Sequence, residues 1–240
     1  RSPSRGLGDV YKRQIIPTLR NLKQMSIRIL FATVFIFSIN TIAAEKEMPH
    51  VFESGDASKG SNMVASCAAC HGADGNSISS DWPKLAGQSE RYLFEQLKYF
   101  KNGERENALM SSVLPILNSY SDKDLLNIAA YYSSQTKTNG QAKDDEELLA
   151  LGEALYRSGN MKKAIPACTA CHSVNGGGNA LAGFPSVAGQ QKAYLVSTLK
   201  AYRTKERNAG DYAAVMQAIS QNLSDDEIDA LANYMHGLYE

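Results

Sequence analysis

The 240-residue sequence contains little cysteine, tryptophan or proline, with four, one and seven residues respectively. Four cysteines are too few for a fold that is held together by a disulfide framework. A composition of 43% hydrophobic and 21% charged residues excludes collagen, coiled coil and bulk disorder, and the length suits one large domain or two small ones. The spacing of the cysteines is therefore more informative than their number.

The sequence also lacks net charge, because 25 Lys and Arg residues balance 25 Asp and Glu residues. This balance hides an asymmetry: the first 44 residues contain seven basic residues and a single acid, Asp9. The remaining residues carry a formal charge of −6. Nucleic-acid binding needs a basic surface, so the composition argues against a nucleic-acid partner.

The first 44 residues are predicted not to belong to the folded protein. Residues 9–14 resemble the translated end of an adapter used to prepare sequencing libraries. A basic start at Met25 leads into an apolar run of eleven residues, 29–39, and then to small residues, the pattern of a signal peptide. Eleven residues are short for a membrane span of about 20, and an uncleaved anchor is the alternative. We expect cleavage after Ala43 or Ala44 and a periplasmic location.

Beyond this segment the sequence repeats itself. Three motifs recur in the same order at offsets of 101, 102 and 103 residues: C-x-x-C-H at 67–71 and 168–172, P-x-x-A-G-Q at 83–88 and 185–190, and S-D at 121–122 and 224–225. An offset that drifts by only two residues indicates tandem duplication of one domain. We place the first domain at 45–137, a polar linker at 138–146 and the second domain at 147–240.

Each half is predicted to consist of helices joined by glycine-rich loops, without an alternating β pattern. Apolar residues at helical spacing follow each glycine-rich stretch, at Leu93, Leu97 and Phe100 and again at Leu195, Leu199 and Tyr202. A capping box begins the last helix of each half, at Ser121-x-x-Asp124 and Ser224-x-x-Glu227. The predicted fold class is all-α. The acidic end of the linker also fits the start of a solvated helix.

The C-x-x-C-H motif is typical of c-type haem attachment, in which two thiols form thioethers with the porphyrin and the adjacent His ligates the iron. A zinc site usually brings its cysteine pairs within about 15–20 residues of each other, whereas these pairs lie in separate repeats. A thioredoxin-like dithiol needs a βαβ context, and local disulfides would leave both histidines unexplained. We therefore expect two covalently bound haem c groups, on Cys67, Cys70 and His71 and on Cys168, Cys171 and His172.

A sixth iron ligand must come from a residue well downstream of each motif. Met110 is the only methionine between the first motif and the linker, and Met216 precedes the last helix in a stretch that reads as a loop, 208–216. We expect these two to ligate the irons. Met235 follows the apolar face of the last helix and Met63 precedes the first motif, so both are expected in the core. The remaining histidines, His50 and His236, have no counterparts and are expected at the surface or an interface.

From about Gly55 to Leu238 the chain resembles the dihaem cytochromes c4, a family of periplasmic electron carriers. The resemblance rests on residues 67–77, 83–88, 91–93, 129–135, 152–160, 166–172, 181–185 and 223–225. It implies two class I cytochrome c domains with His and Met axial ligands, and carbonyl groups of Pro83 and Pro185 that accept hydrogen bonds from the proximal histidines. The sequence departs from the family at 114–117, where the loop after Met110 is reshaped.

The predicted function is one-electron transfer from respiratory-chain donors, a quinol-oxidising complex or a dehydrogenase, to a terminal oxidase or a similar acceptor. Peripheral association with the membrane is compatible with this function. Two protein ligands saturate each iron, which suits a carrier and disfavours an enzyme. Two alternatives remain open. One is an enzyme, a dihaem peroxidase or a thiosulfate-oxidising cytochrome, and the other is the electron-accepting subunit of a sulfur-compound dehydrogenase such as a sulfide-oxidising flavocytochrome.

Overall fold

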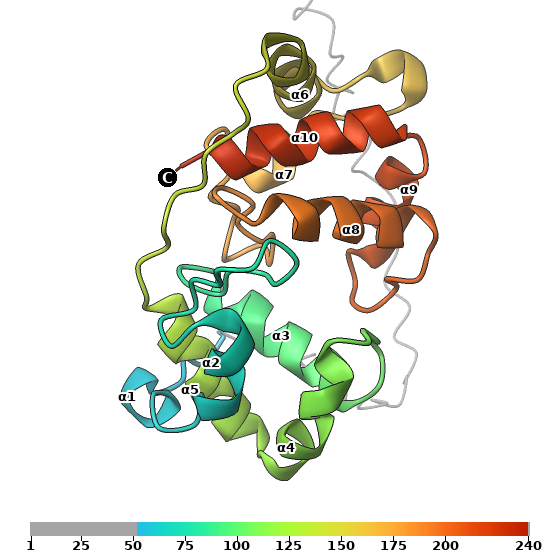
Figure 1. The fold of residues 1–240 in the computed structure, drawn as a ribbon. Helices are drawn as coiled ribbons and strands as arrows, with labels where there is room; N and C mark the ends of the chain where they lie inside the picture. Colours follow the sequence, from blue (N-terminus) through green and yellow to red (C-terminus); the bar gives the residue numbers. More distant parts are fainter. Residues whose placement is uncertain (1–51, 240) are drawn as a thin grey trace, which may run out of the picture. The chain divides into compact units, whose positions relative to one another are not determined.

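Helices provide the regular structure of this protein (Figure 1). The computed structural model describes residues 52–239, so the predicted adapter-like segment and signal peptide lie outside the described residues, as does His50. Within 52–239 the β-type pairs are two isolated bridges, Asn160 with Ile165 and Asn179 with Phe184. In the same range no helix is long and apolar enough to cross a bilayer. The all-α prediction is confirmed.

The two halves contain matching series of helices. The first half comprises α1 (Ala57–Gly60), α2 (Ala65–His71), α3 (Glu90–Lys101), the 3-10 helix η1 (Met110–Val113), α4 (Leu114–Ser119) and α5 (Asp122–Ser133). The second comprises α6 (Glu146–Ser158), the 3-10 helix η2 (Met161–Lys163), α7 (Thr169–His172), α8 (Lys192–Arg203), α9 (Ala213–Ser220) and α10 (Asp225–Gly237).

The last helix of each half begins with the capping box that the sequence predicts. The side chains of Ser121 and Ser224 accept the backbone N–H three residues ahead, and the carboxylates of Asp124 and Glu227 accept the serine N–H in return. The side chain of Asp145 caps α6 in the same region of the chain where the linker was predicted to end. The acidic end of the linker therefore supplies the N-cap and the first turn of α6, where negative charge interacts favourably with the helix dipole.

A glycine lets two helices approach closely in each half. α1 packs across α5 and α6 packs across α10. A Cβ on Gly60 would lie 2.0 Å from the carbonyl oxygen of Asn127, and a Cβ on Gly152 would lie 2.3 Å from that of Ala230. Asn127 and Ala230 occupy equivalent positions, 103 residues apart. The same backbone contact is thus present in both halves, although α1 has 4 residues and α6 has 13.

The hydrophobic core is continuous in the second half and divided in the first. One cluster in the second half contains the buried residues Ile228 and Met235. The first half has two clusters, one built on Ile128 and Tyr132 and the other on Phe100 and Leu125. Met235 is therefore a core residue as expected, and Met63 packs against the first of these clusters.

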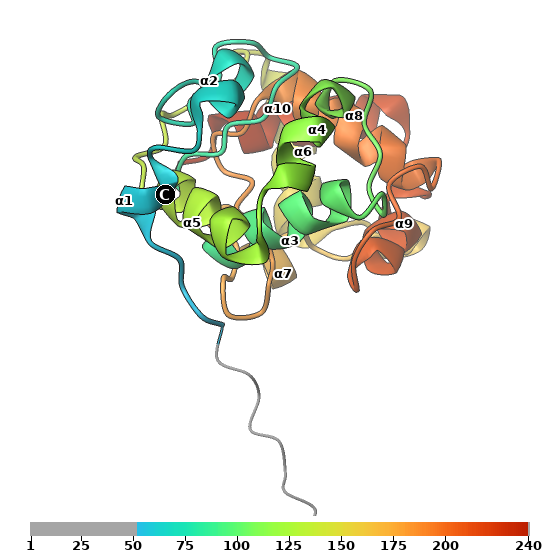
Figure 2. The same ribbon diagram turned by 90° about the horizontal axis from the view of Figure 1, so that it is seen from below.

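Residues 52–239, which include both halves, lie within one compact unit (Figure 2). Arg207, which is buried, joins them: its guanidinium donates to the hydroxyl of Tyr92 at 2.7 Å and to Oε1 of Gln96 at 3.1 Å. Arg105 donates to the same Gln96 oxygen at 2.7 Å. A buried polar interface therefore holds the two repeats together.

Candidate haem sites

The two C-x-x-C-H motifs lie on short helices. Cys67, Cys70 and His71 are on α2, and Cys168 caps α7, which contains Cys171 and His172. Residues three apart on a helix face the same side, so each pair of thiols is directed to a common neighbour. No disulfide joins any of the four cysteines, so each thiol is available for a thioether bond to a haem.

The proximal histidines are held in the same way in both halves. Nδ1 of His71 lies 2.9 Å from the carbonyl oxygen of Pro83, and Nδ1 of His172 lies 2.9 Å from that of Pro185. These are the hydrogen bonds that the family resemblance implies. A carbonyl only accepts, so Nδ1 carries the proton and Nε2 keeps the lone pair that an iron needs. Burial lowers the pKa of both histidines, which favours this neutral form.

The structure places the two candidate methionine ligands on helices. Met110 begins η1, whereas Met216 lies within α9. The loop predicted over 208–216 is present at 208–212, but it is wrong for 213–216, because residues 213–220 pack one face against the second-half core and form a helix. Both side chains are partly buried against apolar clusters.

In the second half the attachment motif and the methionine pack against one apolar cluster. Cys168 and Met216 pack against the same cluster. In the first half Cys67 and Met110 pack against two different clusters, which share three partly buried neighbours: Phe94, Leu97 and Tyr120. An attachment thiol and a methionine therefore contact the same hydrophobic cluster in the second half, and two adjoining clusters in the first half.

The chemistry of these residues fits a haem better than a bare metal ion. Burial raises the pKa of the Cys168 thiol to about 11 and also raises that of Cys67. Thiolate metal sites and redox dithiols need lowered thiol pKa values. Within 52–239 no three His, Cys, Asp or Glu residues are grouped to hold a metal ion. Tyr132 belongs to the cluster against which Cys67 packs, and its buried hydroxyl has no hydrogen-bond partner among the described residues and would accommodate an added acceptor.

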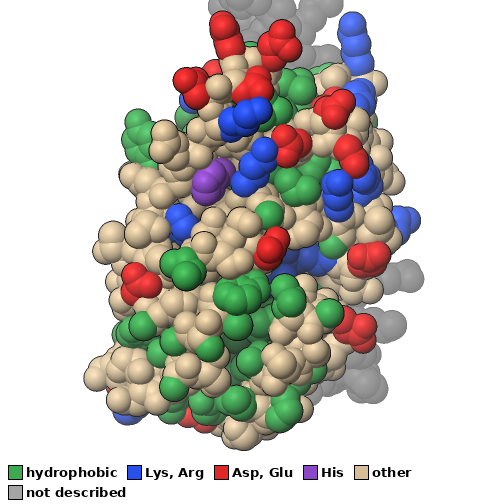
Figure 3. Space-filling model, viewed as in Figure 1, with side chains coloured by type: hydrophobic (Ala, Val, Ile, Leu, Met, Phe, Trp, Pro, Cys, Tyr) green, Lys and Arg blue, Asp and Glu red, His purple; other side chains and the backbone are tan. Residues whose placement is uncertain are grey.

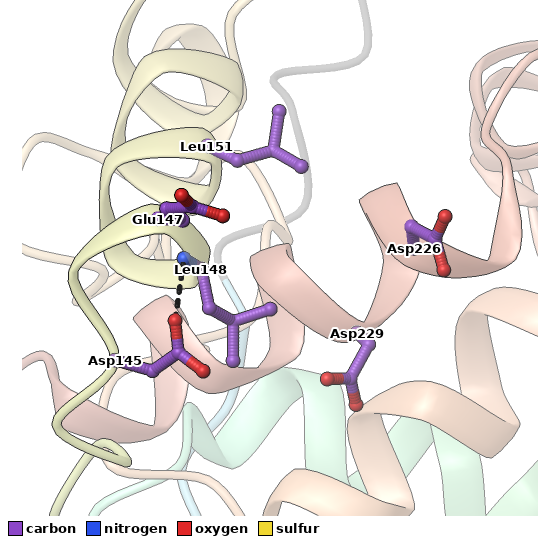
Figure 4. Close-up of a pocket in the computed structure, with 6 residues that line it drawn as sticks. All are labelled: Asp145, Glu147, Leu148, Leu151, Asp226 and Asp229. Carbon is purple, nitrogen blue, oxygen red and sulfur yellow. Dashed lines mark hydrogen bonds between the residues drawn. The ribbon is translucent and has the colours of Figure 1, made fainter.

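The hollow between the first turn of α6 and α10 is a separate feature (Figure 4). It is lined by Leu148, Leu151 and four acids: Asp145, Glu147, Asp226 and Asp229. None of the cysteines, histidines or methionines of the candidate haem sites lines it. The N–H of Leu148 donates to Asp145 at 3.2 Å, and Asp229 pairs with Lys192 at 2.9 Å. These acids serve the helix start and surface pairing.

Comparison with known proteins identifies the class first. The cytochrome c family model matches the chain twice, at residues 57–136 and 149–238. Cytochrome c4 of Pseudomonas aeruginosa is 44% identical over 186 residues, which cover 78% of this chain and 90% of that protein. The crystal structure of reduced recombinant cytochrome c4 from Pseudomonas stutzeri matches with a TM-score of 0.72 and 44% identity, over 78% of this chain and all of that one. The chain belongs to the cytochrome c4 family.

A second group of relatives bears a different name. The thiosulfate dehydrogenase electron acceptor of Thiomonas intermedia is 35% identical over 177 residues, which cover 72% of this chain and 78% of that protein. Thiosulfate dehydrogenase TsdBA from Marichromatium purpuratum matches with a TM-score of 0.66 and 32% identity, over 76% of this chain and 40% of that one.

Membership of the family confirms the main expectations from sequence. The protein is a tandem cytochrome c with two covalently bound haem c groups, and it is an electron carrier rather than an enzyme. The sequence reasoning missed the buried glutamines of the P-x-x-A-G-Q motif, Gln88 and Gln190, whose side chains cross between the halves. Their recurrence at an offset of 102 residues was the available signal.

Proposed function

We propose that the protein is a periplasmic one-electron carrier with His71 and Met110 as the axial ligands of one haem and His172 and Met216 as those of the other. Its donors are a quinol-oxidising complex or a dehydrogenase, and its acceptor is a terminal oxidase or a similar enzyme. The observation that carries the proposal is the pair of identical His–Pro hydrogen bonds, 2.9 Å in both halves, within one compact unit.

Each group of residues has a defined part in this function. The four cysteines hold the haems covalently, and the proline carbonyls keep Nε2 of each histidine directed to the iron. The haem, when bound, supplies reversible one-electron chemistry. Met110 and Met216, as the second protein ligands, would raise the reduction potential and would leave no position open for a substrate. The apolar clusters around Cys67 and Cys168 limit access of water.

The periplasmic location is supported by the predicted signal peptide and by the haem attachment motif. N-terminal sequencing of the protein after export from a Gram-negative host with a c-type maturation system tests it. We expect a mature protein that begins at Ala44 or Glu45 in the periplasmic fraction. A full-length chain retained in the membrane would instead support the uncleaved anchor.

Carrier function is tested by mixing the reduced protein with a terminal oxidase in a stopped-flow instrument. On the face in Figure 3 charged side chains of both signs gather on the second half, while the first half shows mostly uncharged and apolar ones. We therefore expect fast electron transfer that depends on salt. Slow binding of carbon monoxide by the ferrous protein is the control, because both axial positions are filled. Rapid carbon monoxide binding with turnover of peroxide or thiosulfate would contradict the proposal.

A second candidate is the electron acceptor of a thiosulfate dehydrogenase, which the similarity to two proteins of that name favours. A thiosulfate dehydrogenase with thiosulfate should then reduce the protein at a rate that matches enzyme turnover. The matched control is the same mixture with a quinol-oxidising complex and quinol in place of the dehydrogenase. The faster donor of the two identifies which carrier role applies.

A further inference from the structure

Two glutamine side chains cross between the halves and bond to the backbone beside the histidine-binding prolines. Oε1 of Gln88 accepts the N–H of Ser186 at 2.9 Å, and Oε1 of Gln190 accepts the N–H of Lys84 at 2.8 Å. The amide Nε2 of each glutamine donates to the carbonyl of the same residue, both at 2.9 Å. Both side chains are therefore bound at two points in the opposite half.

The contact made by Oε1 of each glutamine lies on the same peptide group as a His–Pro hydrogen bond. Ser186 follows Pro185, so one peptide group accepts from His172 at its carbonyl and donates to Gln88 at its N–H. The peptide between Pro83 and Lys84 does the same for His71 and Gln190. Each proximal histidine is thus linked to a glutamine of the other half through two hydrogen bonds in series.

The glutamines are fixed in position by their surroundings. Gln88 and Gln190 are each 5% exposed, as are Ser186 and Lys84. The same Oε1 atoms also accept the N–H of the following residue in their own half, Ser89 and Gln191, both at 2.9 Å. Water therefore does not replace these bonds, and hydrogen bonds in a poorly solvated interior are stronger than in water.

We propose that Gln88 and Gln190 are positioning residues that each lower the reduction potential of the haem in the opposite half. Accepting the N–H of a peptide group makes its carbonyl oxygen more negative, because hydrogen bonds in series polarise one another. The carbonyl then binds the Nδ1 proton of histidine more strongly, and the imidazole becomes a stronger donor to the iron. Stronger donation stabilises the ferric state and lowers the potential.

A glutamine that merely holds the halves together predicts a different result. Loosening the interface would admit water to both haems, and water stabilises the more highly charged ferric state, so both potentials would fall. If our proposal holds, removing Oε1 of a glutamine should instead raise the reduction potential of one haem, the haem in the opposite half. The direction of the change and the haem that responds therefore distinguish the two roles.

The test uses the complete dihaem protein and the variants Gln88→Met and Gln190→Met, which keep side-chain length but remove the acceptor. Gln191→Met is the matched control, because Nε2 of Gln191 also crosses between the halves, to the carbonyl of Ser77 at 2.6 Å, and its side chain does not bond to the peptide group that follows either proline. Potentials of the individual haems are followed by redox titration with assigned NMR signals. In the reduced protein the Nδ1 proton of each proximal histidine reports its hydrogen bond.

We expect Gln88→Met to raise the potential of the second-half haem and to move the His172 Nδ1 proton upfield. Gln190→Met should do the same to the first-half haem and His71, while Gln191→Met leaves both protons unchanged. A response in the glutamine's own half, a fall in potential, or a change equal to the control overturns the proposal. The inference rests on the proposed histidine ligation, whose failure would appear separately as a high-spin spectrum of the unsubstituted protein.

Discussion

The two halves agree on the histidine side and differ on the methionine side. Both His–Pro hydrogen bonds measure 2.9 Å, and both prolines lie next to a residue bound by a glutamine of the other half. Met216 lies within the eight-residue helix α9, whereas Met110 begins the 3-10 helix η1, which α4 follows directly. Pro115 in the first turn of α4 fits that break, because proline is tolerated there and disrupts a helix interior.

This difference shows which side of the site is constrained. The histidine side is bonded to the other half, so a change there would disturb two domains at once. In the first half the contacts of η1 and α4 are with each other and with α3, against a core that is divided into two clusters. A change in these two helices therefore disturbs contacts within one half.

The largest expected effect is the loss of a methionine ligand. Met216→Ala should reduce the weak red charge-transfer band of the ferric protein to the intensity expected for one haem. It should also lower the reduction potential of the haem that loses its ligand, because axial ligands set potentials over about 0.8 V among haem proteins. Met110→Ala should do the same to the other haem. Absorption spectra with redox titration check both, and mass spectrometry should still find two haems.

Met110→Ala also tests whether the first half has a methionine ligand at the same place as the second. If Met110→Ala leaves the band at its full two-haem intensity, the reorganised segment of the first half does not ligate through Met110. Met63→Ala is the control in the same half, since Met63 is a core residue that should leave the band unchanged.

A smaller effect is expected at the glycines of the helix crossings. A Cβ at Gly152 or Gly60 would meet backbone atoms, so the helices must separate, at a cost of about 1–3 kcal/mol. We expect Gly152→Ala to cost more, because α6 is a long helix with a buried face, whereas α1 is a single turn that can shift. Chemical denaturation of the oxidised protein measures the difference. Gly103→Ala is the reference for a glycine substitution without a steric clash, because a Cβ there would meet no other atom. Its cost comes only from the positive φ at this position, which alanine rarely adopts.

The smallest effect is expected at the helix caps, where the halves are alike. Ser121→Ala and Ser224→Ala should each lower the free energy of unfolding by about 1 kcal/mol, because each removes the serine hydroxyl that accepts a backbone N–H in the first turn of the helix. Equal losses in thermal or denaturant unfolding are expected. A markedly larger loss for Ser224→Ala would show that the continuous second core depends on the exact start of α10.

The sequence predicted correctly the elements that depend on residues close together in the chain. The capping boxes, the apolar spacing of α3 and α8 and the C-x-x-C-H motifs all depend on residues a few positions apart, and all appear where the sequence indicates. The helix around Met216 was missed because its apolar face is defined by contacts with the second-half core. The glutamine links were missed because a polar side chain near a loop gives no sign that it is buried against a distant segment.

Gln88 and Gln190 make equivalent bonds in opposite directions between the halves, as equivalent residues do across the interface of a two-fold symmetric dimer. In such an interface both copies use the same surface. Residue i of the first copy contacts residue j of the second, and residue j of the first contacts residue i of the second. Duplication and fusion preserve that relation while allowing the two copies to diverge elsewhere. Substitutions in this surface must therefore arise in compatible pairs, one in each repeat, whereas the segment around Met110 can change alone.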